Sequence, residues 1–235
     1  MTYAALPKTT GRVHEVLAGR AIPFGGQATL SAIQKHPITG EVRIMRHGIE
    51  CDEQGDKRIH GGVDKAIHCY PFEHYSAWRS EISHVPVLGQ VGAFGENLSL
   101  SGLVEQTVCL GDIWCIGTTQ LVVTQGRQPC WKLNIRFGVT DMARRVQDSL
   151  RAGWYMRVEQ EGILQAGDPV VLLGRPHPNW PIARLLGLIR DRVTDTQTLE
   201  EVLCLPLVPS WQHLFQNRLR DGIAEAWGAR MDGHD

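Results

Sequence analysis

One cysteine lies between basic residues in the segment RQPCWK at 127–132, directly after an apolar stretch at 121–124. The cations Arg127 and Lys132 on either side of Cys130 favour the thiolate over the thiol. A thiolate attacks electrophiles and binds soft metals, so the segment is typical of a nucleophilic or metal-binding cysteine. A half-buried structural cysteine remains the alternative, because free cysteine is among the residue types most often buried.

A second segment, HGGVDKA at 60–66, could bind an anion. Two adjacent glycines allow backbone N–H groups to approach a ligand closely and to form a concave anion site. Positively charged or basic side chains surround the two glycines: Lys57, Arg58, His60 and Lys65. A plain Gly-Gly turn beside a solvated charged strip is the alternative that the pattern leaves open.

The third candidate is the stretch GAFGENL at 92–98. Glu96 and Asn97 follow a glycine and could offer a carboxylate acceptor and an amide to a polar heterocycle such as a pterin. Most Gly-Glu-Asn stretches are only turns, so this signal is weak by itself.

Several other chemistries lack the residues that they need. No C-x-x-C or H-E-x-x-H motif for zinc occurs, and strand alternation at 65–70 sends His68 and Cys69 to opposite faces. The G-x-S-x-G, P-loop and G-x-G-x-x-G motifs are also absent, which disfavours a serine hydrolase and the common nucleotide sites. The 24 Lys and Arg against 25 Asp and Glu leave no basic surplus for duplex nucleic acid.

The first two-thirds of the chain contain short apolar stretches, many of them β-branched, between glycine turns. We expect strands at 13–16, 28–33, 42–45, 65–70, 104–110, 113–116, 121–124, 154–158 and 170–173. Many short strands with turn signals favour a barrel or sandwich over βαβ units. Two helices are expected among them, at 72–82 and 140–151, from apolar residues three or four apart. The predicted fold class is mainly β with α (α+β).

The segment GRPHPNWP at 174–181 contains three prolines, which break helices and sheets, and it predicts a linker. Three helical segments are expected after it: one at 182–193, one capped at 194–198, and one at 211–227. The sequence therefore predicts a β-barrel domain at 1–173, a linker at 174–181 and a small three-helix domain at 182–235.

The bulk composition predicts a cytoplasmic protein. Hydrophobic content of 43% and charged content of 21% are ordinary for a globular protein with a core. No apolar run approaches the roughly 20 residues needed to cross a bilayer, and no secretory signal is visible. The six cysteines form no disulfide-like framework, so reduced thiols are expected. We therefore expect no membrane partner.

Several motifs stand in a fixed order: G-I-x-x-D at 48–52, H-G-G-x-D-K-A at 60–66, Y-P-x-E-H-Y-x-x-W at 70–78, G-E-N-L at 95–98, G-D at 111–112 and R-x-P-C-x-K-L at 127–133. Together they resemble the MOSC domain, which is named for the C-terminal part of molybdenum cofactor sulfurases. The later G-W-Y-x-R-V at 153–158 and the helical tail resemble the YiiM branch, where three helices follow the barrel. The resemblance covers essentially the whole chain.

This resemblance implies a MOSC β-barrel-like domain that holds a molybdenum–molybdopterin cofactor, with no PLP, flavin or iron–sulfur cluster on this chain. A cysteine thiolate binds molybdenum in relatives, and the matching position here is Cys130, as metal ligand and catalytic residue. Cofactor-binding roles carry over to the matching positions His60, Gly61, Gly62, Asp64, Lys65, Glu96, Asn97, Arg127 and Lys132.

The implied activity is the reduction of N-hydroxylated small molecules, such as hydroxylamino-purines or amidoximes, to amines with electrons from a partner reductase. The same thiol supports an alternative role as a sulfur carrier that accepts a persulfide on Cys130. A third alternative is a pterin- or anion-binding module without turnover. Neither nucleic acid nor membrane is an expected partner, and a homodimer stays open.

Two positions depart from the family pattern. Cys51 stands where the family usually has glycine before Asp52, and Gly126 stands where many relatives have proline. Cys51 is either a second thiol, able to form a disulfide with Cys130 or to trap the cofactor's metal, or a residue that only packs where a small side chain fits. Gly126 is expected to loosen the approach to Arg127, because glycine does not fix φ.

Overall fold

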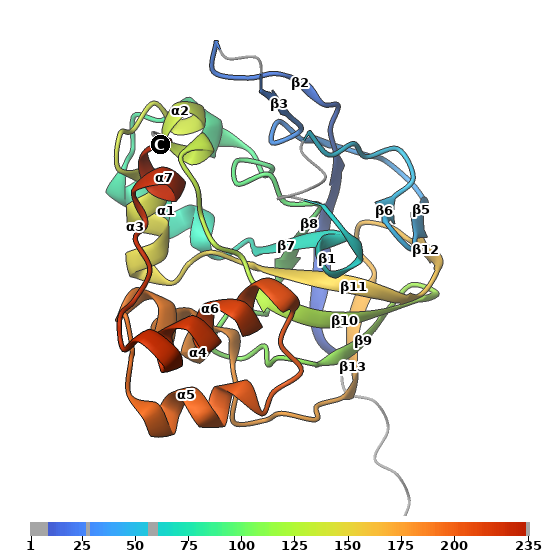
Figure 1. Ribbon diagram of the computed structural model, residues 1–235. Helices are drawn as coiled ribbons and strands as arrows, with labels where there is room; N and C mark the ends of the chain where they lie inside the picture. Colours follow the sequence, from blue (N-terminus) through green and yellow to red (C-terminus); the bar gives the residue numbers. More distant parts are fainter. Residues whose placement is uncertain (1–8, 27–28, 56–60, 234–235) are drawn as a thin grey trace, which may run out of the picture.

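The centre of the molecule is a closed β-barrel (Figure 1). The computed structural model describes residues 9–26, 29–55 and 61–233. Seven strands form the barrel: β1 (Thr9–Ala18), β7 (Ile67–Pro71), β8 (Leu98–Ser101), β9 (Ile113–Ile116), β10 (Thr119–Gly126), β11 (Trp154–Gln160) and β13 (Pro169–Gly174). They are hydrogen-bonded in the order β13-β9-β10-β11-β7-β8-β1, and β1 pairs again with β13. All of these pairs are antiparallel except β7 with β8, which is parallel.

Short strands extend the barrel. β4 (His36–Pro37) pairs with the end of β1. β5 (Val42–Met45) pairs on one side with β6 (Gly48–Ile49) and on the other with β12 (Gly162–Leu164). β2 (Ile22–Pro23) and β3 (Leu30–Ser31) form a separate hairpin.

Helices lie in two groups. The first consists of α1 (His74–Glu81), α2 (Lys132–Phe137) and α3 (Met142–Ser149), with the 3-10 turns η1 (Val63–Lys65) and η2 (Pro86–Gly89). The second consists of α4 (Ile182–Arg190), α5 (Thr196–Leu203) and α6 (Pro209–Asp221). The final helix α7 (Gly228–Asp232) lies beside α2 rather than in the second group (Figure 1). Among the described residues, no helix is long and apolar enough to span a bilayer.

The core fills the barrel and continues under the helices. Trp114 of β9 and Trp154 of β11 are fully buried, with ring centroids 6.1 Å apart in an edge-to-face arrangement. Trp211 and Phe215 of α6 are buried as well, so they are core residues of the helical group. Alternating burial along β9 matches the period of two expected for a barrel strand.

The α+β fold class is confirmed, and the strands predicted at 42–45 and 113–116 have those bounds. The stretch at 104–110 forms turns instead of a strand, with Thr107 and Val108 N–H groups donating to the Val104 carbonyl. β8 and α2 were not predicted. The helix expected to reach Trp227 ends at Asp221, because Gly222 adopts a left-handed conformation that terminates it.

The proline-rich segment at 174–181 is bonded to the barrel. The Leu110 N–H donates to the Trp180 carbonyl over 3.0 Å, and the Ile182 N–H donates to the Val108 carbonyl over 2.8 Å. Arg175 forms an ion pair with the buried Asp112 at 2.6 Å. These contacts join the segment to the barrel. A domain division at 174–181 therefore stays a prediction.

Gly126 is the last residue of β10, where it lies opposite Trp154 of β11. A Cβ atom at this position would lie 2.7 Å from the side chain of Leu186 in α4. Glycine is therefore required by the close approach of α4 to the barrel. The expectation that it loosens the approach to Arg127 is wrong, because strand pairing and α4 fix the backbone here.

Replacing Gly126 with alanine should destabilise the protein by about 1–3 kcal/mol, because the added methyl group overpacks the contact with Leu186. Equilibrium urea unfolding measures this loss. In a Leu186→Ala background the same substitution should cost less, because the smaller neighbour leaves space. Equal costs in the two backgrounds would show that Leu186 does not limit position 126.

Candidate active site

A cleft of about 700 Å³ opens beside the barrel. Its lining comes from positions within 31–35, 52–55, 65–68, 94–97 and 127–132, together with Tyr155. Segments far apart in the sequence therefore meet around one space. The predicted residues Lys65, Asn97, Arg127, Cys130 and Lys132 all line it.

Cys130 lies in the loop between β10 and α2, and its side chain is half-buried. The Leu133 N–H donates to the Cys130 carbonyl over 3.0 Å, so the turn into α2 begins at the cysteine. The thiol lies close enough to Lys65 to act on its charge: burial lowers the pKa of Lys65, and Cys130 opposes that shift. The sulfur thus faces the cleft rather than the apolar interior.

Cations gather around this thiol. Arg127 and Lys132 are buried, with 5% and 6% of their surface exposed. The Arg127 Nη1 atom has no hydrogen-bond partner among the described residues. A buried guanidinium N–H without a partner is costly, so the cleft is suited to an anionic ligand that accepts from it.

The glycine loop contributes through Lys65 rather than through its own backbone. Gly61 and Gly62 are described but do not line the cleft. The Lys65 N–H donates to the Gly62 carbonyl over 3.0 Å, which forms the turn η1 and places Lys65 in the cleft lining. His60, with the neighbouring Lys57 and Arg58, lies outside the described residues.

Asn97 connects three parts of the cleft wall. Its Oδ1 accepts from the His68 N–H at 3.1 Å, and its Nδ2 donates to Asp52 at 2.9 Å and to the Leu17 carbonyl at 3.3 Å. The side chain therefore holds the start of β8 against β7 and the loop at Asp52.

Two predicted cofactor residues have side chains outside the cleft lining. Glu96 is fully buried and accepts from the Tyr75 hydroxyl and the Gly92 and Phe94 N–H groups, so it fixes its own turn. Asp64 forms an ion pair with Arg157 of β11 at 2.9 Å, and neither residue lines the cleft. Both carboxylates are satisfied by protein partners, and neither side chain belongs to the set that faces the cleft.

A buried ion pair that was not predicted as part of the site lines the cleft. Lys35 Nζ lies 2.5 and 2.6 Å from the two carboxylate oxygens of Asp52, and each side chain is 7% exposed. The Gly19 N–H also donates to Asp52 at 2.7 Å. Burial lowers the pKa of Lys35, and Asp52 opposes that shift. Asp52 belongs to the motif G-I-x-x-D at 48–52, so the sequence could have indicated it. Lys35 belongs to none of the motifs.

His68 and Tyr155 complete the wall next to Arg127. Their rings lie 5.0 Å apart between centroids. Burial, together with the positive charge of Arg127, lowers the pKa of His68 to about 3. Burial also raises the pKa of Tyr155, an effect that Arg127 opposes. Both groups are therefore neutral near pH 7.

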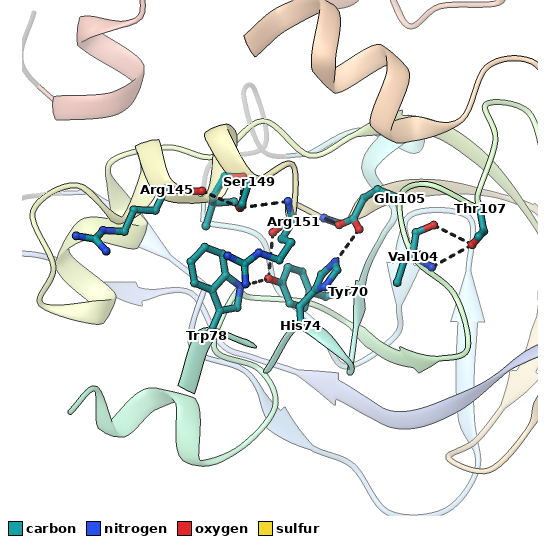
Figure 2. Close-up of polar contacts among 11 residues, drawn as sticks. Tyr70, His74, Trp78, Val104, Glu105, Thr107, Arg145, Ser149 and Arg151 are labelled. Carbon is teal, nitrogen blue, oxygen red and sulfur yellow. Dashed lines mark hydrogen bonds and ion pairs between the residues drawn. The ribbon is translucent and has the colours of Figure 1, made fainter. Parts of the chain in front are cut away.

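A buried network holds the backbone of Arg127 against the start of β11. The Arg127 N–H donates to the Gly153 carbonyl over 3.0 Å, and the Gly153 N–H donates to Glu105 over 2.6 Å. The second oxygen of Glu105 lies 2.7 Å from His74 Nε2 (Figure 2). Gly153 has φ +75°, and a Cβ there would lie 2.3 Å from the Cys69 carbonyl, so only glycine fits.

Cys51 is an exposed thiol that does not line the cleft. It is connected to the site only through the backbone, because the next residue, Asp52, forms the ion pair with Lys35. The packing role considered for it is wrong, because an exposed side chain fills no interior space.

Comparisons with known proteins identify the family of this chain. The MOSC domain model matches residues 56–171. Protein YiiM of Escherichia coli (strain K12) is 35% identical over 86% of this chain and 91% of its own length. The crystal structure of YiiM from Geobacillus stearothermophilus has a TM-score of 0.76 and 31% identity, over 89% of this chain and 99% of that one. This chain belongs to the YiiM branch of the MOSC domain family.

A protein of Gibberella moniliformis (strain M3125 / FGSC 7600) named "Reductase" is 38% identical over 92% of this chain. This chain spans 39% of that protein's length. The MOSC match at 56–171 contains Lys65, Arg127 and Cys130 but neither Lys35 nor Asp52. The cleft of this MOSC protein is therefore completed by residues from outside the matched segment.

The pKa of His68 predicts a dependence of stability on pH. The unfolded chain binds a proton at this histidine near pH 6.5, whereas the folded protein binds it only near pH 3. The contribution of neutral His68 to the free energy of unfolding is therefore fully present above pH 6.5. It is lost as the pH falls towards 3, at up to ~1.4 kcal/mol per pH unit. Urea unfolding at a series of pH values measures it.

The matched control is His36, which is exposed. His68→Gln should reduce the slope of unfolding free energy between about pH 6 and pH 4, where only the unfolded chain is protonated at this residue. His36→Gln should leave that slope as it is. An unchanged slope in the His68 variant would contradict its neutral burial.

Proposed function

We propose that this protein is a molybdenum cofactor-dependent oxidoreductase that reduces N-hydroxylated small molecules to amines. The observation that carries the proposal is the convergence of the half-buried Cys130 with Lys65, Arg127 and Lys132 on one cleft. Membership of the MOSC family and the similarity to a fungal protein named "Reductase" support an oxidoreductase.

The residues of the cleft fit a phosphorylated molybdenum–pterin cofactor. A thiolate is a ligand that soft and borderline metals accept, and Cys130 is the only cysteine that lines the described cleft. The unpartnered Arg127 Nη1, with Lys65 and Lys132, provides donors for a phosphate. Cys130 would hold the metal, and the three cations would hold the anionic part of the cofactor.

Reduction of an N-hydroxyl group consumes two electrons and two protons and releases an amine and one water. When bound, the cofactor would supply the two electrons for cleavage of the N–O bond. Electrons would reach it from a partner reductase, because the sequence contains no flavin, haem or iron–sulfur motif of its own.

One of the two protons can come from a group on the cleft wall, and the other can come from solvent that enters the open cleft. Lys35 Nζ is held on the cleft wall by both oxygens of Asp52, and its burial makes the ammonium a stronger acid than an exposed lysine. We assign it the role of donating a proton to the departing oxygen. Asp52 orients Lys35 and would guide its reprotonation.

The first test uses Cys130→Ala. The purified wild-type protein should contain molybdenum and pterin, measured by metal analysis and pterin fluorescence. The variant should lose both, together with reduction of a hydroxylamino-purine in the presence of a reductase. Cys204→Ala, which removes an exposed cysteine in the helical group, is the matched control and should keep all three.

Retention of stoichiometric molybdenum by Cys130→Ala would refute the ligand assignment. The sulfur-carrier role gives a different result with the same proteins. Incubation with a PLP-dependent desulfurase and cysteine would then leave a persulfide on Cys130, visible by mass spectrometry, in protein that binds no molybdenum.

The second test addresses Lys35. Lys35→Met should retain molybdenum but reduce the rate of N-reduction by about 10²–10⁴-fold, the usual loss when a general acid is removed. Arg20→Met is the control, because it breaks an exposed ion pair with Glu53 beside the same cleft. An unchanged rate in a loaded Lys35→Met protein would rule out proton donation by this lysine.

A further inference from the structure

The end of the chain returns to the loop that carries Cys130. After α6 the backbone leaves the helical group, and α7 lies beside α2 (Figure 1). Met231 of α7 is 1% exposed, and its carbonyl accepts from Asn134 of α2 at 2.9 Å. The tail is therefore packed against α2, next to the loop that carries Cys130. It lies outside the segment 56–171 that the MOSC model matches.

One residue of this tail bonds to both neighbours of Cys130. The Arg230 carbonyl accepts from the Trp131 N–H at 2.8 Å. Arg230 Nη1 donates to the Pro129 carbonyl over 2.7 Å. Its Nη2 donates to Gln147 of α3 over 2.6 Å, which anchors the guanidinium to a second element.

Placing Arg230 here costs free energy, both from desolvation of its charge and from loss of side-chain freedom. Burial lowers the pKa of Arg230, and the nearby Glu225 and Cys130 oppose that shift. A long side chain also loses rotamer freedom when it is fixed. The hydrogen bonds to Pro129 and Gln147 compensate for this desolvation, so the side chain and the loop stabilise each other.

We propose that Arg230 is a positioning residue for Cys130, and that the C-terminal segment 228–233 acts as a clasp that fixes the 129–131 loop against the cleft. The Pro129 carbonyl and the Trp131 N–H have Arg230 as their partner, and Pro129 offers no N–H of its own. Release of the clasp frees the backbone on both sides of the thiol. The inference holds for molybdenum binding and for sulfur transfer alike.

The test is amide hydrogen exchange of the full-length protein, read on peptides that cover 127–136. Arg230→Ala keeps the backbone carbonyl that accepts from the Trp131 N–H but removes the side-chain bonds to Pro129 and Gln147 that hold this carbonyl in place. The bond to Trp131 should therefore open more often, and exchange of its amide should accelerate by about tenfold, which corresponds to about 1.4 kcal/mol of lost local stability. Arg230→Lys, which keeps a charge and a donor for Pro129, should recover part of the protection. Arg184→Ala is the matched control, because this arginine bonds a backbone carbonyl and stacks on Trp180 far along the chain from the clasp.

A second variant releases the clasp without touching Arg230. Asn134→Asp keeps the oxygen that accepts the Ala143 N–H but loses the donor to the Met231 carbonyl, so it should also accelerate exchange at 129–131. If either variant fails to fold, the other decides the outcome. Wild-type exchange at Trp131 in a folded Arg230→Ala or Asn134→Asp protein would overturn the inference.

A chemical readout connects the clasp to the thiol. The iodoacetamide labelling rate of Cys130, measured relative to the exposed Cys204 in the same sample, should change in Arg230→Ala and return towards the wild-type ratio in Arg230→Lys. A role confined to tail stability would leave this ratio unchanged, and that result would overturn the positioning role. Neither readout needs molybdenum, so failure here is distinguishable from failure of the proposed function.

Discussion

Buried positive charge is the constraint around which the cleft is organised. Lys35 is matched by Asp52, whereas Arg127 keeps an Nη1 atom without a partner among the described residues. Removing a cation from water costs free energy unless an opposite charge compensates for it. A cleft that carries this uncompensated donor beside a thiol is therefore suited to an anionic ligand.

The barrel makes this arrangement possible because it brings strand ends together. Arg127 follows β10 and bonds to Gly153 at the start of β11, while Asn97 precedes β8 and bonds to His68 in β7. These two cleft residues are thus tied to neighbouring strands. The helices add a second layer of support, since α4 packs on Gly126 and α7 binds the loop around Cys130.

Prediction from the sequence succeeded where local pattern and local structure coincide. β5 and β9 were expected with their observed bounds because each is a short apolar stretch, partly β-branched, flanked by turn residues. Prediction failed where a side chain had several chemically suitable partners. Glu96 resembled a ligand for a heterocycle, but it accepts hydrogen bonds from Tyr75 and its own turn, since folding places those donors nearer. Lys35 was overlooked because nothing nearby in the sequence marks its pairing with Asp52.

By itself, the sequence determined the α+β class and the family and singled out Cys130, because these depend on residue types and on their order along the chain. Only the tertiary structure decided which charges share the cleft with Cys130 and that Arg230 holds both of its neighbours. Contacts between residues 100 positions apart leave no local periodicity. They depend on strand pairing and helix packing, which are settled only when the whole chain has folded.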